Sequence, residues 1–170
     1  MGSGKTTLGR CIAKELGLEF IDLDIFIEKR YHSSVREIFE NKGEEFFRKT
    51  EKSILHEVAD FQDVIIACGG GTPCHFDNMD FMNSRGLTIY LNTSADTLFN
   101  RLSVTSAKEK RPLLTDMSDD EMKEFIKNSI GVREPFYLKA KISFNSNDLD
   151  SFSDIKESIA ILTQLIQTDI

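Results

Sequence analysis

The chain begins with a short glycine-rich turn, Gly2-Ser3-Gly4, that leads directly into a helical pattern. Over residues 5–16 apolar side chains recur at every fourth position, and Gly17 follows as a C-terminal stop. Small residues ahead of a helix let backbone N–H groups converge on an anion, and the helix dipole favours negative charge there. Because an amphipathic helix and an apolar strand follow at once, the turn favours a phosphate site at the start of a helix over a frayed chain terminus.

The residues that follow the turn match the second half of the phosphate-loop pattern G-x-x-x-x-G-K-[ST]. Lys5 is placed to reach the β- and γ-phosphates of a nucleotide, and the hydroxyl of Thr6 is a candidate Mg²⁺ ligand. The first glycine of the pattern would fall two residues before Met1. We expect nucleotide binding by Gly2, Ser3, Gly4, Lys5, Thr6 and Thr7.

Strand and helix patterns alternate along the rest of the chain. Four short apolar runs predict strands, at residues 18–24, 63–68, 87–92 and 140–145. Amphipathic patterns predict helices at residues 34–39, 44–61, 95–102, 122–130 and 155–166. Strands separated by helices favour one α/β domain over 1–170, with a parallel sheet covered by helices on both faces. The polar segment at about 103–121 is predicted to be a mobile lid.

Charge and composition exclude several classes of function. The formal net charge of −7 argues against general binding to nucleic acid or anionic membranes, and no apolar run is long enough to span a bilayer. Three cysteines, an odd number, favour a reducing cytoplasm over a disulfide framework, and no second metal-binding pair accompanies them. We expect a cytoplasmic monomer in which a local cluster of cations binds any anionic ligand.

Three further motifs are predicted to lie at the edge of the sheet that carries the phosphate turn, because ligands of parallel α/β sheets bind beyond the carboxyl ends of the strands. Asp22 and Asp24 end one predicted strand with both carboxylates on the same side. The triple glycine 69–71 ends another and offers backbone that a ligand can approach closely. Arg48 precedes Glu51 by one helical turn, so these two side chains can pair.

Two more arginines accompany these motifs: Arg111 inside the predicted lid and Arg133 just after the helix predicted at 122–130. Each feature alone has a structural explanation, since a surface arginine is usually solvated and a DxD sequence is often a turn. Their predicted convergence on one rim is what favours a functional site.

The motifs GSGKTTLGR, DLD, FFRKTE, GGG, KRPLL and REPFY, in this order and at these intervals, resemble those of the shikimate kinases over essentially the whole chain. The resemblance implies the nucleoside monophosphate kinase fold, a five-stranded parallel sheet between helices with a lid. It also implies ATP-dependent phosphorylation of the 3-hydroxyl of shikimate, in aromatic amino-acid biosynthesis, with Mg²⁺ as cofactor.

The resemblance further implies a role for each substrate-side residue. Asp24 would accept hydrogen bonds from the substrate hydroxyls and would orient or deprotonate the attacking one. Arg48 and Arg133 would bind the substrate carboxylate with their planar guanidinium groups. The glycines of the triple-glycine turn would also contact the substrate, the central one through its backbone: Gly69, Gly70 and Gly71.

On the nucleotide side, the resemblance implies that Arg111 closes with the lid and, together with Lys5, stabilises charge on the transferring phosphoryl group. Asp22 would reach Mg²⁺ through water, next to Thr6. Arg101 matches the position that stacks on the adenine.

The sequence departs from the family pattern at its N-terminus. The family's phosphate-loop strand lies in the middle of the sheet, between the strands expected here at 63–68 and 87–92. Its loss would remove about six buried apolar side chains, or about 9–18 kcal/mol, which is comparable to the stability of a whole domain. We expect that the protein begins about ten residues earlier. The alternative is a real but impaired short form.

Two other functions are compatible with the sequence. A kinase of the same architecture acting on gluconate or a nucleoside monophosphate is one, although paired arginines favour a carboxylate substrate and the DLD motif a polyhydroxylated one. A non-catalytic nucleotide-binding module, inactivated by its short phosphate loop, is the other.

Overall fold

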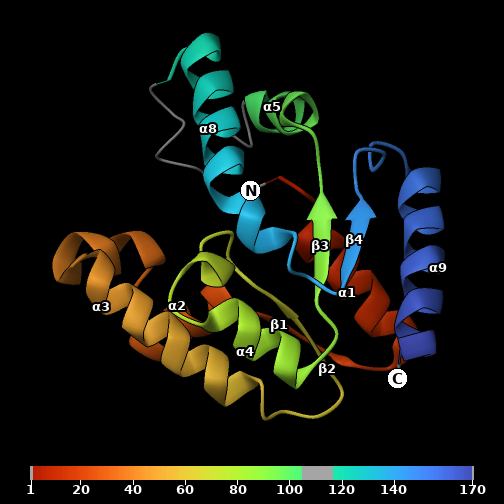
Figure 1. The fold of residues 1–170 in the computed structure, drawn as a ribbon, viewed down its shortest axis with the longest axis horizontal. Helices are drawn as coiled ribbons and strands as arrows, with labels where there is room; N and C mark the ends of the chain where they lie inside the picture. The colour runs from red at the N-terminus through yellow and green to blue at the C-terminus, as the bar shows by residue number, and fades with distance from the viewer. Residues whose placement is uncertain (1, 105–116, 170) are drawn as a thin grey trace.

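The computed structural model describes residues 2–104 and 117–169 of the chain (Figure 1). Within these residues, strands alternate with helices, as the sequence predicts. Each strand is shorter than the apolar run that predicts it. The strands found over residues 2–104 and 117–169 are β1 (Glu19–Asp22), β2 (Val64–Ala67), β3 (Ile89–Asn92) and β4 (Ile142–Asn145).

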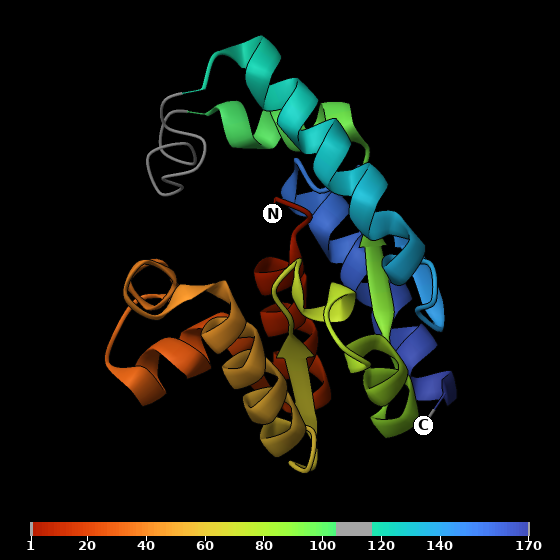
Figure 2. The same cartoon turned by 60° about the vertical axis from the view of Figure 1, so that its left-hand side comes forward.

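The strands form two separate parallel pairs, β1 with β2 and β3 with β4. In the first pair Asp22 lies opposite Ala67, and in the second Asn92 lies opposite Asn145. Within the described residues no ladder joins β2 to β3, and Figure 2 shows these two strands standing apart. The interruption lies at the position where the family's central strand is expected.

Two helices hold the strand pairs together from one side. Helix α1 (Lys5–Leu16) contacts β1 and β2, and it also packs against α9 (Phe152–Asp169). Leu8 and Ile12 of α1 form a buried cluster with Leu162 and Ile166 of α9, against which side chains of β2, β3 and β4 pack. This shared apolar core connects the two halves of the interrupted sheet.

A second core lies beneath helices α2 (Leu23–Tyr31) and α3 (Val35–Val58), with α4 (Asn78–Arg85) beside them. The capping box predicted at Ser34 and Glu37 is present and begins α3. Gly43 interrupts that helix with φ of 81°, which separates the two helices that the sequence predicts.

The helices α5 (Ala95–Ser103) and α8 (Asp119–Tyr137) pack against each other beyond the carboxyl ends of β3 and β4 (Figure 1). Their common core comprises Leu98, Leu102, Met122 and Ile126. A single turn of 3₁₀ helix, η1 (Thr72–Cys74), follows the triple glycine.

Two predicted elements differ from the structure in ways that move site residues. The strand expected over 18–24 ends at Asp22, because the Asp22 side chain accepts a hydrogen bond from the Ile25 N–H (3.4 Å) and caps α2. Asp24 therefore lies in the first turn of a helix rather than at a strand end.

The helix expected over 122–130 runs from Asp119 to Tyr137, so Arg133 lies inside it rather than after it. A capping box between Ser118 and Glu121 starts this helix early, and Pro135 does not end it. Of the predicted lid over 103–121, residues 105–116 lie outside the described part of the chain, and Arg111 is among them.

Candidate active site

Leucine side chains from other segments pack closely against the phosphate turn. Gly2 and Gly4 have left-handed backbone conformations, with φ of 72° and 91°. A Cβ atom at Gly4 would lie 2.6 Å from Leu149, and one at Gly2 would lie 3.3 Å from Leu98. Gly4 supplies no side-chain cap to α1. The backbone N–H groups of the first helical turn are therefore suited to bind an anionic ligand.

Thr6 and Asp22 connect the phosphate turn to the end of β1. The Thr6 hydroxyl donates a hydrogen bond to Asp22 Oδ2 at 3.2 Å. The described residues contain no cluster of three or more His, Cys, Asp or Glu side chains suited to hold a metal on their own. A pair of one hydroxyl and one carboxylate nevertheless fits Mg²⁺, which usually takes few protein ligands and completes its shell with water and substrate phosphates.

Asp24 is a carboxyl group with a strongly altered acidity. Burial raises its pKa from 3.8 to about 6, and the nearby carboxylates of Glu51 and Asp22 add to this rise, while Lys5 opposes it. A carboxyl with a pKa near 6 is well suited to accept a proton at neutral pH. The opposing effect of Lys5 also shows that the phosphate turn lies within electrostatic range of Asp24.

The triple-glycine turn is surrounded by the three polar side chains that the sequence singles out. A Cβ atom at Gly69 would lie 3.0 Å from Asp24 Oδ1. A Cβ atom at Gly71 would lie 2.7 Å from Arg48 Nη1. A Cβ atom at Gly70 would lie 3.2 Å from Nη1 of Arg133, which is on α8. Three successive glycines thus allow a carboxyl and two guanidinium groups, from three different helices, to approach one backbone turn.

Arg48 is held in a defined orientation. Its Nη1 contacts Glu51 Oε2 at 2.9 Å, and its Nε contacts Glu44 Oε1 at 3.2 Å. Its guanidinium also lies over the rings of Phe39 and Phe47. Because the Arg48 side chain is only 14% exposed and Glu51 is 1% exposed, this pair is largely shielded from water. The pairing of Arg48 with Glu51 predicted from their spacing is confirmed.

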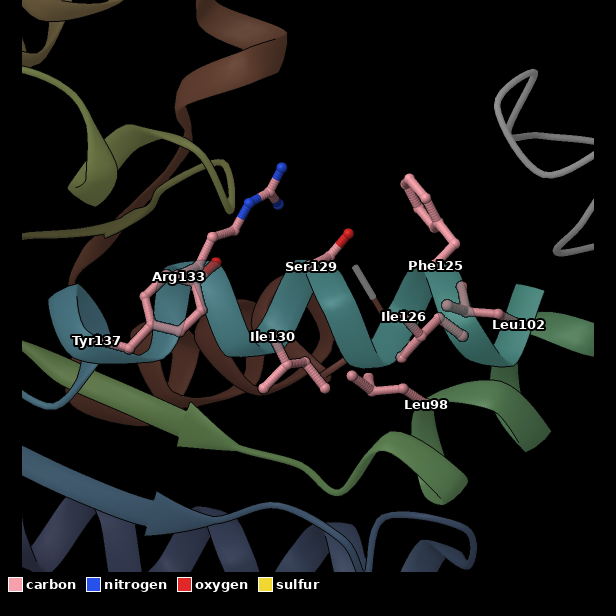
Figure 3. A pocket seen from close by; sticks show the side chains of 8 residues that line it. All are labelled: Leu98, Leu102, Phe125, Ile126, Ser129, Ile130, Arg133 and Tyr137. Atoms are coloured by element: carbon pink, nitrogen blue, oxygen red, sulfur yellow. The ribbon is translucent and has the colours of Figure 1, made fainter. Parts of the chain in front are cut away.

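Arg133 projects from α8 on the same side as Phe125 and Ser129, whereas Ile126 and Ile130 project toward α5 (Figure 3). One turn further along, the Tyr137 hydroxyl donates a hydrogen bond to the carbonyl of Gly70 at 2.6 Å. Tyr137 was missed by sequence reasoning. Its i,i+4 spacing from Arg133 was the available signal, but it is informative only once both residues are known to lie on one helix.

Arg101 connects three segments near the phosphate turn. It donates hydrogen bonds to the carbonyls of Ser146 (2.9 Å), Asn147 (2.6 Å) and Gly2 (3.5 Å). The side chain is 17% exposed and also pairs with Asp150 at 3.4 Å. Arg101 therefore lies beside the expected nucleotide site, while its stacking on adenine stays a prediction.

Two cysteines adjoin the triple-glycine turn: Cys68 precedes it, and Cys74 Sγ contacts the Gly70 carbonyl at 3.7 Å. All three cysteines, Cys11, Cys68 and Cys74, are free thiols in the described residues. Burial raises the pKa of Cys68 to about 12, so it stays protonated at physiological pH. None of the described helices has the length and apolar character needed to cross a bilayer.

The structure thus brings together most of the predicted site. The phosphate turn, Asp22, Asp24, Arg48, Arg133 and the triple glycine lie around one region at the carboxyl ends of β1 and β2. Arg111 lies outside the described residues. The arrangement offers an anion site at a helix N-terminus, a carboxyl base, and two guanidinium groups for a second anionic ligand.

Comparisons with protein families, with curated proteins and with solved structures agree with one another. The family model described as shikimate kinase matches residues 1–166. The chain is 49% identical to the shikimate kinase of Phocaeicola vulgatus, over 94% of this chain and 90% of that protein. It superposes on the crystal structure of shikimate kinase from Bacteroides thetaiotaomicron with a TM-score of 0.94 at 46% identity, covering 98% of this chain and 94% of that one. For shikimate kinase from Acinetobacter baumannii in complex with shikimate, the TM-score is 0.82 at 29% identity, with coverage of 100% and 90%.

Proposed function

Because this chain belongs to the shikimate kinase family, we propose that the residues around the triple-glycine turn bind the substrate and activate its hydroxyl in that family's reaction. The chain is an ATP-dependent kinase that transfers the γ-phosphate of ATP to the 3-hydroxyl of shikimate and yields shikimate 3-phosphate. The observation that carries the assignment of roles is the approach of Asp24, Arg48 and Arg133 to three successive glycines.

The two arginines bind the substrate carboxylate. Arg48 and Arg133 approach neighbouring glycines from α3 and α8, so a carboxylate placed against the turn meets both guanidinium groups. A guanidinium presents parallel N–H donors that match the two oxygens of a carboxylate, whereas a lysine offers a single charged point. Glu51 engages Nη1 of Arg48 and keeps its guanidinium next to Gly71.

Asp24 acts on the hydroxyl that attacks ATP. Above a pH of about 6 its carboxylate is ionised and accepts a hydrogen bond from the substrate 3-hydroxyl. As the oxygen of that hydroxyl forms its bond to the γ-phosphorus, the bond to the β-phosphate oxygen breaks and ADP leaves. The hydroxyl proton passes to Asp24. The buried surroundings of Asp24 strengthen this contact by excluding water.

The nucleotide phosphates bind at the start of α1. The turn Gly2–Gly4 and the first-turn N–H groups surround the anion, with Lys5 directed at the β- and γ-phosphates and Thr7 completing the turn. Thr6 and Asp22 would hold Mg²⁺, which neutralises charge on the phosphate oxygens when bound. We assign the adenine contact to Arg101 and the closing arginine to Arg111.

We further propose that residues 1–170 form a single domain, which acts as a monomer in the cytoplasm and binds no nucleic acid. The formal net charge of −7 and the free thiols support this proposal.

The test of the proposed function is a coupled assay of ADP release with purified chain, ATP and Mg²⁺. We expect turnover with shikimate and none above background with gluconate or AMP, and phosphorus NMR should detect one new phosphate monoester. Lys5→Ala should abolish this turnover. ADP release that does not depend on shikimate, or that is unchanged in Lys5→Ala, would contradict the assignment.

A further inference from the structure

Thr72 follows the triple-glycine turn directly and is completely buried, with 0% of its surface exposed. Its hydroxyl donates a hydrogen bond to Glu51 Oε1 at 2.7 Å. Its backbone is anchored independently: its N–H contacts the Gly69 carbonyl at 3.1 Å, and its own carbonyl accepts from Asn78 Nδ2 at 2.9 Å. The position of the residue is therefore set by the backbone contacts, and the hydroxyl is available for Glu51.

Glu51 is a buried carboxylate whose two oxygens have different partners. Oε1 accepts from the Thr72 hydroxyl at 2.7 Å, and Oε2 accepts from Arg48 Nη1 at 2.9 Å. A buried carboxylate is costly unless both oxygens are satisfied. The bond to Thr72 therefore determines the rotation of the Glu51 carboxylate, and that rotation determines where Oε2 meets Arg48.

From this geometry we propose that Thr72 is a positioning residue for the substrate carboxylate, acting through Glu51 on Arg48. The Thr72 hydroxyl orients Glu51, Glu51 orients the Arg48 guanidinium, and the guanidinium lies against Gly71 where the carboxylate binds. The identity of the ligand rests on the proposed function. Thr72 touches none of the reacting atoms, so its effect should appear in substrate affinity rather than in the chemical step.

The test compares Thr72→Val with Thr72→Ser in steady-state kinetics. Valine keeps the shape and the backbone contacts but lacks the hydroxyl, whereas serine keeps the hydroxyl. We expect Thr72→Val to raise the KM for shikimate about tenfold, because a hydrogen bond to a charged group is lost. The kcat and the KM for ATP should change less than about twofold, and Thr72→Ser should stay within about twofold of the parent chain.

Thr163 supplies the matched control. It is a buried threonine on α9, 8% exposed, and its hydroxyl has no hydrogen-bond partner within the described residues. Thr163→Val therefore removes a buried hydroxyl without breaking a contact, and it should leave the KM for shikimate unchanged.

The methyl ester of shikimate separates positioning from a general loss of structure. The ester lacks the anionic carboxylate, so its KM should be the same for the parent chain and for Thr72→Val. The inference would be overturned if Thr72→Val had the parental KM for shikimate. It would also be overturned if the substitution raised the KM values for shikimate, the ester and ATP by equal factors. If Thr72→Val does not fold by circular dichroism, Thr72→Ala carries the same expectations. A chain that turns over no shikimate, either alone or with an added N-terminal apolar strand, would instead overturn the proposed function, and the inference with it.

Discussion

The hydroxyl of Tyr137 donates a hydrogen bond to the carbonyl of Gly70 at 2.6 Å, although the two residues are 67 positions apart in sequence. This contact ties the end of α8 to the centre of the triple-glycine turn, next to Arg133. The helix that carries a substrate-binding arginine and the turn that the substrate approaches are therefore fixed relative to each other.

Removing the hydrogen bond between Tyr137 and Gly70 should lower the stability of the fold and weaken the binding of shikimate. We expect Tyr137→Phe to lower the free energy of unfolding by about 1 kcal/mol, since the Gly70 carbonyl loses its short hydrogen bond from the hydroxyl and keeps only the longer contact with Cys74 Sγ. The KM for shikimate should rise several-fold as Arg133 becomes less well placed. Urea unfolding and steady-state kinetics measure the two effects. Tyr90→Phe is the control, because the Tyr90 ring packs against Tyr137 but its hydroxyl does not contact the turn. Equal effects of both substitutions would count against the role of the hydroxyl.

The raised pKa of Asp24 predicts the pH dependence of the reaction. Because this pKa is about 6, the carboxylate that accepts the proton is lost as the pH falls through about 6. A plot of kcat/KM against pH should therefore have an acidic limb with a midpoint near 6. Asp24→Asn should remove that limb and lower kcat about 10²–10⁴-fold. A pH-independent rate between 5 and 8 in the parent chain would be inconsistent with this role.

The same group should make the fold less stable at higher pH. The pKa of Asp24 is about 6 in the folded chain and its ordinary value is 3.8, so the folded state binds the proton more tightly. Its stabilising contribution is complete below about pH 4 and is lost as the pH rises through about 6. Asp24→Asn, which does not ionise, should therefore gain stability relative to the parent chain on going from pH 5 to pH 8, by about 1–3 kcal/mol. Urea unfolding at the two pH values tests the sign.

The geometry of Arg48 predicts that lysine cannot replace it. Arg48→Lys keeps the charge but loses the planar fork that meets both Glu51 and a ligand carboxylate. We expect the KM for shikimate to rise about 10–100-fold, with a smaller change in kcat and an unchanged KM for ATP. Arg36→Lys on the same helix is the control, since Arg36 pairs only with the exposed Glu40 in the described contacts. An Arg48→Lys enzyme with the parental KM would show that the carboxylate binds elsewhere.

The interruption between β2 and β3 predicts the effect of an added strand. The change is an N-terminal extension whose sequence is that of an apolar strand followed by Gly-x. This strand should pair with both β2 and β3. It should raise the free energy of unfolding by several kcal/mol, because each large apolar side chain that becomes buried contributes about 1.5–3 kcal/mol. Solubility and turnover should rise with it. An extension of equal length made of glycine and serine is the control. Comparable melting temperature and turnover for the 170-residue chain and its apolar extension would refute the expectation.

Much of the fold was readable because its signals are local. The phosphate turn before α1, the capping box at Ser34 and the stop at Gly17 each depend on residues within a few positions of one another. The alternation of apolar strands with amphipathic helices depends only on periodicity, and it predicted the four strands that the described residues contain. Where two local signals compete, the prediction failed, as at Asp22, which ends a strand and caps a helix at once.

The sequence by itself determined which chemical groups this protein has available: a phosphate turn, paired carboxylates, three glycines in a row and arginines spaced along the chain. Only the tertiary structure decided which of them meet. The contacts of Thr72 with Glu51 and of Tyr137 with Gly70 join residues 21 and 67 positions apart, and no periodicity relates such pairs. They depend on how α3 and α8 pack around one backbone turn, which is a property of the whole core rather than of any segment.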